Sequence, residues 1–269
     1  MSYTTTVGGM VDDNFQEVTY IDDPNLQTLA INDPTGSALA QAQIAPGVAR
    51  VSSSYSSLDS ANPAFSLMSD ALTYWTDTVT IDDPLLNGTL GHFTANLLVS
   101  GTASYGLSGG YASGDPFSDA YIYGFWNSWI GTSTDNGDSF LVGGWFGEWT
   151  SDPDGNVFYS GDDLSQPLTE VTLDFIYGQP FLLRMNMEAY TDASNFNVLA
   201  GTASGTLDFS HTAYWNGISG FFDASGNPTN PNFSSGSGMD WRNSAVPEPS
   251  VLLALGTGLL FMRKRRARR

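Results

Sequence analysis

Apolar and polar residues alternate in short stretches along most of the chain. In residues 170–177, for example, apolar side chains occupy Val171, Leu173 and Phe175, and polar ones fall mainly between them. A period of two is typical of a β-strand with one buried face. The same pattern, with its many Thr, Tyr, Phe, Trp and Val residues, predicts strands over residues 72–81, 90–104, 120–130, 139–150, 170–177, 181–190 and 197–209.

Turn-forming residues separate these stretches. Asp, Asn, Gly and Pro cluster at residues 135–138, 152–156, 177–180 and 225–228. No part of the chain before residue 245 keeps up the 3.6-residue apolar period of an amphipathic helix. The pattern therefore predicts an all-β protein. An antiparallel β-sandwich of the jelly-roll or lectin-like kind fits it best, followed by a flexible stalk and a short C-terminal apolar helix.

Composition divides the chain into four parts. Residues 1–65 form an N-terminal extension or the first strands, with a Ser-rich loop expected at residues 52–60. Residues 66–222 make up the β-sandwich body. Residues 223–245, rich in Gly, Ser, Asn and Pro, are predicted to form a loop and a flexible stalk. Residues 246–269 form a separate C-terminal segment.

Charge sets that C-terminal segment apart from the rest. The chain has 9 Lys+Arg against 28 Asp+Glu, but only Arg50, Arg184 and Arg242 precede residue 246. Residues 1–245 thus carry 3 cations and 27 acids, a net of −24, whereas residues 246–269 carry 6 cations and 1 acid, a net of +5. So acidic a body disfavours binding to nucleic acid or to anionic polysaccharide, unless divalent cations bridge them.

The C-terminal segment has three parts in a fixed order. A short motif comes first, an apolar run follows, and a cationic cluster ends the chain. The motif is Val246, Pro247, Glu248, Pro249 and Ser250. The apolar run extends over residues 251–262 and includes Val251, Leu252, Leu253, Leu255, Leu259, Leu260 and Phe261. The cationic cluster consists of Arg263, Lys264, Arg265, Arg266, Arg268 and Arg269.

The apolar run is short for a membrane span. As a helix it would rise about 18 Å, against a hydrocarbon core of roughly 30 Å, and a buried structural helix is the alternative. However, a core helix would not normally end in so dense a cationic cluster, and long Arg and Lys side chains can lengthen the effective span. Cations beside an apolar segment also keep their end in the cytoplasm. We therefore expect a weak or transient membrane anchor.

This order of parts resembles the PEP-CTERM sorting signal of exported bacterial proteins. In that family the Pro-Glu-Pro element, here Pro247, Glu248 and Pro249, is recognised by an exosortase, a transpeptidase that removes the tail. The resemblance implies an exosortase-type partner and a route through the inner membrane to the cell surface or the extracellular space. Two prolines also favour an extended backbone that a peptidase can bind.

The start of the chain departs from that family. Residues 1–13 contain no cation and no apolar core of a signal peptide, so we expect an export segment upstream of the sequence given. The absence of cysteine agrees with a destination outside the cytosol.

The sequence offers little catalytic chemistry. Cysteine catalysis is excluded, and His92 and His211 lack the spacing of a zinc motif. Glu148 lies among aromatic residues at 143–149 and could serve a glycosidase together with an Asp partner. As a strand residue, it could equally point into water from the face opposite Trp145 and Trp149. We expect no catalytic residues.

Two kinds of ligand fit the composition. Aromatic residues in the middle of the chain could bind a polysaccharide, although core packing explains such residues equally well; they are Tyr121, Tyr123, Trp126, Trp129, Trp145, Trp149 and Trp215. Asp152, Asp154 and Asn156, with Asp162 or Asp163 nearby, offer oxygen atoms for a loosely bound calcium ion, but they do not form a complete EF-hand loop. No other cofactor is expected.

These observations predict an exported, acidic structural or adhesive protein of the bacterial cell surface or exopolysaccharide matrix. The alternative is a secreted carbohydrate-binding protein or a glycoside-active enzyme.

Overall fold

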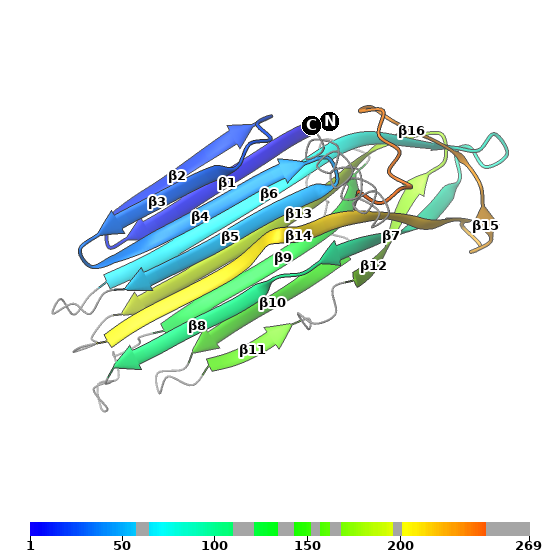
Figure 1. Ribbon diagram of the computed structural model, residues 1–269. Coiled ribbons are helices and arrows are strands. Elements are labelled where there is room, and N and C mark those ends of the chain that lie inside the picture. The colour runs from blue at the N-terminus through cyan, green and yellow to red at the C-terminus, as the bar shows by residue number, and fades with distance from the viewer. Residues whose placement is uncertain are drawn as a thin grey trace, which may run out of the picture.

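The computed structural model describes residues 1–57, 65–109, 121–133, 143–151, 157–161, 168–195 and 201–245. Within these ranges every regular element is a strand, and the strands pair antiparallel in two sheets (Figure 1). This confirms the predicted all-β, antiparallel class. In the part of the chain that is described, no helix has the length and apolarity that a membrane span requires. The C-terminal segment, residues 246–269, lies outside the described residues.

The first sheet, sheet A, brings strands from both halves of the chain together. Its order is β11 (Val157–Gly161), β10 (Gly143–Ser151), β9 (Tyr121–Ser133), β13 (Pro180–Asn195), β6 (Phe65–Asp82), β1 (Ser2–Val11) and β2 (Asn14–Ile21). The short strand β16 (Asn232–Ser235) also pairs with β6.

The second sheet, sheet B, is built in the same way. Its order is β12 (Leu168–Ile176), β7 (Leu90–Val99), β14 (Gly201–Asp223), β5 (Val48–Ser57), β4 (Gly36–Ala45) and β3 (Gln27–Asp33). Strands β8 (Thr102–Gly109) and β15 (Pro228–Thr229) pair with β14. Residues 1–57 therefore supply strands to both sheets. The sequence left two possibilities for this region, an N-terminal extension or the first strands, and these residues form strands.

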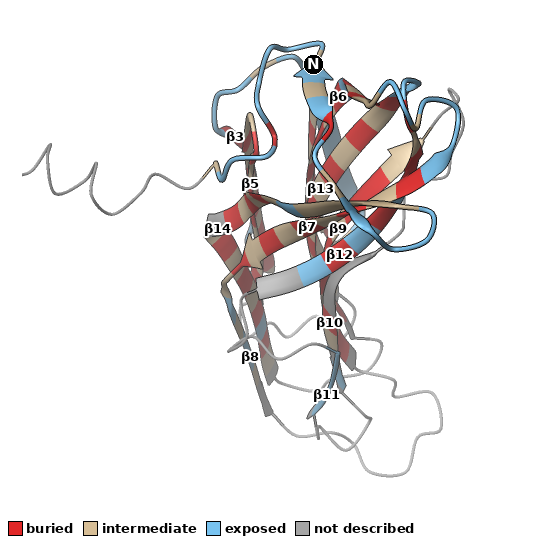
Figure 2. Cartoon of the chain, turned by 90° about the vertical axis from the view of Figure 1, so that its right-hand side faces the viewer, coloured by how far each residue is buried: buried red, intermediate tan, exposed pale blue. Residues whose placement is uncertain are grey.

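The core lies between the two sheets. Buried positions alternate with more exposed ones along the strands, as Figure 2 shows, and the residues predicted to be apolar on β12, Val171, Leu173 and Phe175, are buried. One large cluster joins buried residues of both sheets, for example Ala71 and Met187 of sheet A with Leu97 and Leu207 of sheet B. This is the arrangement of a β-sandwich, in which the inner faces of two sheets exclude water together.

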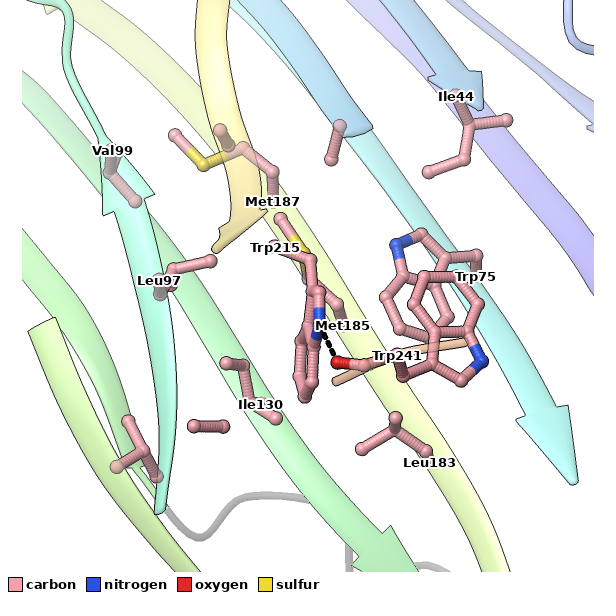
Figure 3. Packing of buried hydrophobic residues seen from close by; sticks show 14 of the residues in the cluster. Ile44, Trp75, Leu97, Val99, Ile130, Leu183, Met185, Met187, Trp215 and Trp241 are labelled. Carbon is pink, nitrogen blue, oxygen red and sulfur yellow. Dashed lines mark hydrogen bonds between the residues drawn. The ribbon is translucent and has the colours of Figure 1, made fainter. Parts of the chain in front are cut away.

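Three tryptophans form the centre of this core (Figure 3). The rings of Trp75 and Trp241 are stacked, with 4.4 Å between centroids, and the edge of Trp215 meets both rings at about 6 Å. Trp215 Nε1 donates a hydrogen bond of 2.6 Å to the backbone oxygen of Trp241. Residues 75, 215 and 241 thus join β6, β14 and the C-terminal end of the described chain.

The buried carboxylate of Asp77 also holds the C-terminal end of the described chain. Asp77 is 1% exposed, and its Oδ2 accepts a 2.8 Å hydrogen bond from Trp241 Nε1 and another from Ser237 Oγ. The backbone nitrogen of Ser237 donates to Oδ1 at 3.1 Å, and the amino group of Met1 lies 3.7 Å from the same atom. Each donor offsets part of the cost of burying the charge.

Residues 223–245 therefore differ from the flexible stalk that their composition predicts. β15 pairs with β14, β16 pairs with β6, and Trp241 is buried. At the end of the segment the backbone nitrogen of Ala245 donates to Trp215 O at 2.9 Å. Gly47, at φ +68°, fits beneath Ala245 only because it has no side chain: a Cβ there would lie 2.6 Å from Ala245 Cβ.

One loop prediction and one strand prediction also need correction. Residues 52–57 are part of β5 rather than of a Ser-rich loop, since Ser53 Oγ donates to Ser69 O at 2.7 Å and lies 2.6 Å from Thr191 Oγ1 inside the core. Residues 90–104 form parts of two strands, β7 and β8, which are separated at residues 100–101. Gly101 packs so closely against Phe209 that a Cβ at position 101 would overlap the ring.

Candidate binding face of sheet A

The outer face of sheet A carries a row of residues that crosses the strands. The register pairs Gly8 with Glu17 and Asp70, Tyr190 with Asp70 and Phe125, and Glu148 with Phe125 and Ser160. In order from β2 to β11, the row is Glu17, Gly8, Asp70, Tyr190, Phe125, Glu148 and Ser160. We call it the transverse row. With neighbouring strands about 4.8 Å apart, it spans about 29 Å.

The alternation of the strands turns this row away from the core. On β6, β13 and β9, the residues adjacent to those of the row, Ala71, Ala189 and Trp126, point inward and have no appreciable exposure. Side chains on the row must therefore point outward. Asp70, Tyr190, Phe125 and Glu148 are half-buried there.

Aromatic rings occupy the middle of the face. Phe125 and Tyr190 lie 5.3 Å apart, centroid to centroid, with their planes inclined by 26°. Tyr123, two residues before Phe125 on β9, lies 5.9 Å from Phe125 and 6.2 Å from Tyr190. Three rings from two neighbouring strands thus form one continuous apolar platform.

Carboxylates flank the platform and are held by polar neighbours. Tyr123 Oη donates to Glu148 Oε2 at 3.3 Å. On the neighbouring row, Asn127 Nδ2 donates to Glu188 Oε2 at 2.7 Å, and Asn186 Nδ2 donates to Asn127 Oδ1 at 3.3 Å. The two amides fix the position of Glu188 and leave its other carboxylate oxygen to a different partner.

The face is electrostatically unbalanced. Burial, together with the nearby charges of Glu188 and Glu17, raises the pKa of Asp70 to about 7. Burial also raises the pKa of Glu188, against the opposing effect of its hydrogen bond from Asn127. Asp70 Oδ1 is buried and, among the described residues, has no hydrogen-bond donor. Within the same residues, Asp70, Glu188 and Glu148 form no ion pair. A cation on this face would relieve their repulsion.

The backbone spacing does not by itself bring Glu148 and Glu188 to a glycosidase separation. Glu148 and Glu188 are two strands apart and offset by two residues, which separates their Cα atoms by about 12 Å. Glycoside hydrolysis requires the two carboxyl groups to be about 5 to 9.5 Å apart. A continuous platform of rings with acceptors on both sides is suited to holding an extended ligand.

The structure separates the residues that the sequence offered as candidates. Glu148 and Tyr123 lie on this face, and Trp129 is a half-buried residue of the same side of β9. Trp126 and Trp215 are fully buried in the core, so they cannot stack on a ligand. His92 packs against Phe222 on sheet B, with 5.1 Å between ring centroids.

Other candidates lie beyond what is described. These are the side chains of Tyr121, Trp145, Trp149 and His211, the calcium candidates Asp152, Asp154 and Asn156 with Asp162 and Asp163, and the sorting motif with its membrane segment. Among the described residues, no group of three or more His, Cys, Asp or Glu side chains is arranged to hold a metal ion.

Sequence reasoning missed Asp70, Glu188, Phe125 and Tyr190. The scarcity of glutamate gave a partial signal, since the body contains only Glu17, Glu148, Glu170 and Glu188, and three of these lie on the outer face of sheet A.

Comparison with known proteins gives no relative from which a function could be transferred: no family model, no curated protein and no solved structure matches this chain.

Proposed function

We propose that this chain is an exported, acidic structural or adhesive protein of the bacterial cell surface or exopolysaccharide matrix. Its C-terminal segment directs it there, and an exosortase-type transpeptidase processes it at Pro247–Glu248–Pro249. Residues 251–262 form the short apolar helix that holds the tail in the inner membrane, and the cations after residue 262 keep its end in the cytoplasm. The body, at a net of −24, lies on the opposite side.

The observation that carries this proposal is the position of the last hydrogen bond between the C-terminal end of the described chain and the body. Ala245 makes a backbone hydrogen bond to Trp215, and the Pro-Glu-Pro motif begins two residues later. None of the interactions described for Trp241 and Ala245 involves the motif, so a cut within it would leave them intact. The motif that a transpeptidase would bind therefore follows directly after the last described contact of the body.

Processing predicts a mass that can be measured. In the native host, the exported protein is expected to lack residues after the motif, whereas a Pro247→Ala/Pro249→Ala variant retains Arg269 and accumulates in the membrane fraction. Intact-mass spectrometry of both fractions distinguishes the two products. Pro84→Ala, in an exposed turn of the body, is the matched control and should be processed normally. Wild-type chains that keep Arg269 in the cytosol would overturn the proposal.

The outer face of sheet A supports binding rather than catalysis as the activity of the body. The platform of rings and its flanking carboxylates can hold a polysaccharide of the matrix, while the overall acidity disfavours nucleic acid. The glycosidase alternative predicts new reducing ends when the protein is incubated with such a polymer, and loss of that activity in Glu148→Gln. We expect no release of reducing ends by the wild-type protein.

A further inference from the structure

We infer that the transverse row of sheet A binds a cationic polysaccharide, a polymer of amino sugars with free amines, laid across the strands. The inference would give the proposed adhesive role its ligand. It stands on sheet A alone, however, and does not depend on the sorting signal.

The rings supply the first half of such a site. Phe125, Tyr190 and Tyr123 present a platform of three rings in mutual contact, flanked along the row by polar side chains. Pyranose rings pack their axial C–H faces against aromatic rings, and the packing stabilises through buried apolar area. In an extended β-linked chain, the rise per sugar is similar to the spacing between strands. Successive sugars can therefore follow the row across the sheet.

The carboxylates supply the second half. Glu148 lies on one side of the rings, and Asp70 and Glu17 lie on the other, with Glu188 on the neighbouring row. Gly8, between Asp70 and Glu17, is buried, and a Cβ there would be in ordinary contact, at 3.8 Å, with both Asp70 Cβ and Glu17 Cγ. The two acids therefore lie on either side of a position at which β1 presents no side chain to a ligand.

Charge complementarity selects the ligand class. Asp70 Oδ1 is buried without a donor in the described part of the protein, and its repulsion by Glu188 and Glu17 is uncompensated. An ammonium group on the outer face would offset this repulsion, because charge-assisted hydrogen bonds to the accessible carboxylate oxygens are the strong ones. An acetylated polymer could use the rings but would bring no cation to the carboxylates. An anionic polymer would be repelled, and a basic peptide would not need the rings.

A matched pair of ligands tests the inference on the purified full-length chain in mild detergent. The fully deacetylated β-1,4-linked glucosamine hexamer and its fully N-acetylated counterpart have the same rings and differ only in the amines. Isothermal titration calorimetry should show the deacetylated hexamer binding at least about tenfold more tightly, since each charge-assisted hydrogen bond supplies about that factor.

Variants on the row should separate the two contributions. Asp70→Asn combined with Glu148→Gln is expected to reduce the preference for the deacetylated hexamer by about tenfold and to leave the binding of the acetylated one unchanged. Tyr190→Leu keeps an apolar side chain but removes a ring, and should weaken both hexamers by about three- to tenfold. Glu170→Gln, an exposed carboxylate on sheet B, is the control and should bind as wild type does.

Three results would overturn the inference. They are equal affinity for the two hexamers, row variants that bind like Glu170→Gln, and a lysine hexapeptide that binds as tightly as the deacetylated sugar. The last would indicate a basic peptide as the partner. Circular dichroism of each variant shows whether it has folded. Since the assay requires neither export nor processing, a protein that binds the hexamer but keeps its tail in the native host would overturn the proposed function alone.

Discussion

Replacing Trp241 with alanine is expected to lower the free energy of unfolding by about 4 kcal/mol, the usual cost of removing a fully buried indole. Trp241 is 1% exposed and stacked on Trp75, and it also makes two hydrogen bonds in the core. Truncation would empty the site between the sheets and take a donor away from the buried carboxylate of Asp77. Urea denaturation followed by tryptophan fluorescence measures the change.

Two further variants separate the contributions at this site. Trp241→Phe keeps a stacked ring but loses the N–H that binds Asp77, so we expect a loss of about 2 kcal/mol. Met239→Ala changes an exposed residue of the same segment and should stay within about 0.5 kcal/mol of wild type. Limited proteolysis of Trp241→Ala should produce new cuts between residues 236 and 245. An unchanged urea midpoint would show that the segment is not fastened through Trp241.

The local pattern of the sequence predicted the strands well where one face is apolar and the other polar. β12 is the clearest case, because Val171, Leu173 and Phe175 alternate with more polar positions and only one register buries them together. The pattern failed where inner positions are polar. Ser53 and Ser57 of β5 point into the core between the sheets. Ser53 Oγ donates a hydrogen bond to Ser69 O, and Ser57 Oγ accepts one from the backbone nitrogen of Ala203. No local signal reveals such partners, which lie on other strands.

The end of the body was mispredicted for a related reason. Gly, Ser and Asn in residues 223–245 are typical of a flexible linker. Trp241 nevertheless fixes the segment on the body. Its partners Asp77 and Trp75 lie on β6 and Trp215 lies on β14, so the two sheets position all three of them. The segment is therefore held by contacts such as the one between Trp241 and Asp77, which are more than 160 positions apart in the sequence, and local composition cannot reveal them.

The candidate binding face could be anticipated only in fragments. The sequence singled out Glu148 and Tyr123, but the transverse row is formed by seven strands whose order in sheet A bears little relation to their order in the chain. Asp70 and Tyr190 become neighbours of Glu17 and Glu148 only through long-range pairing. The alternation gives the direction in which each side chain points, whereas the register that aligns them depends on the whole fold.

The same face should make the stability of the protein depend on pH in an unusual direction. Burial and two neighbouring acids raise the pKa of Asp70 from 3.8 to about 7, so between these values the folded protein keeps a proton that the unfolded chain has lost. The corresponding stability is fully present below 3.8 and is lost as the pH rises through about 7. The raised pKa of Glu188 acts in the same direction.

Asp70→Asn is therefore expected to stabilise the protein above neutral pH, by on the order of 3 kcal/mol relative to wild type at about pH 8, and to change little at about pH 4. The amide of this variant would carry no charge for Glu188 and Glu17 to repel, so the variant should also lose much of the downward slope of stability between those two pH values. Urea denaturation across this range measures both effects. Asp174→Asn, at an exposed position on β12, is the matched control and should follow the wild-type slope. If Asp70→Asn also follows that slope, Asp70 ionises as an ordinary surface carboxylate. The charge argument for a cationic ligand would then lose its main support, because a carboxylate well solvated by water gains little from a bound ammonium.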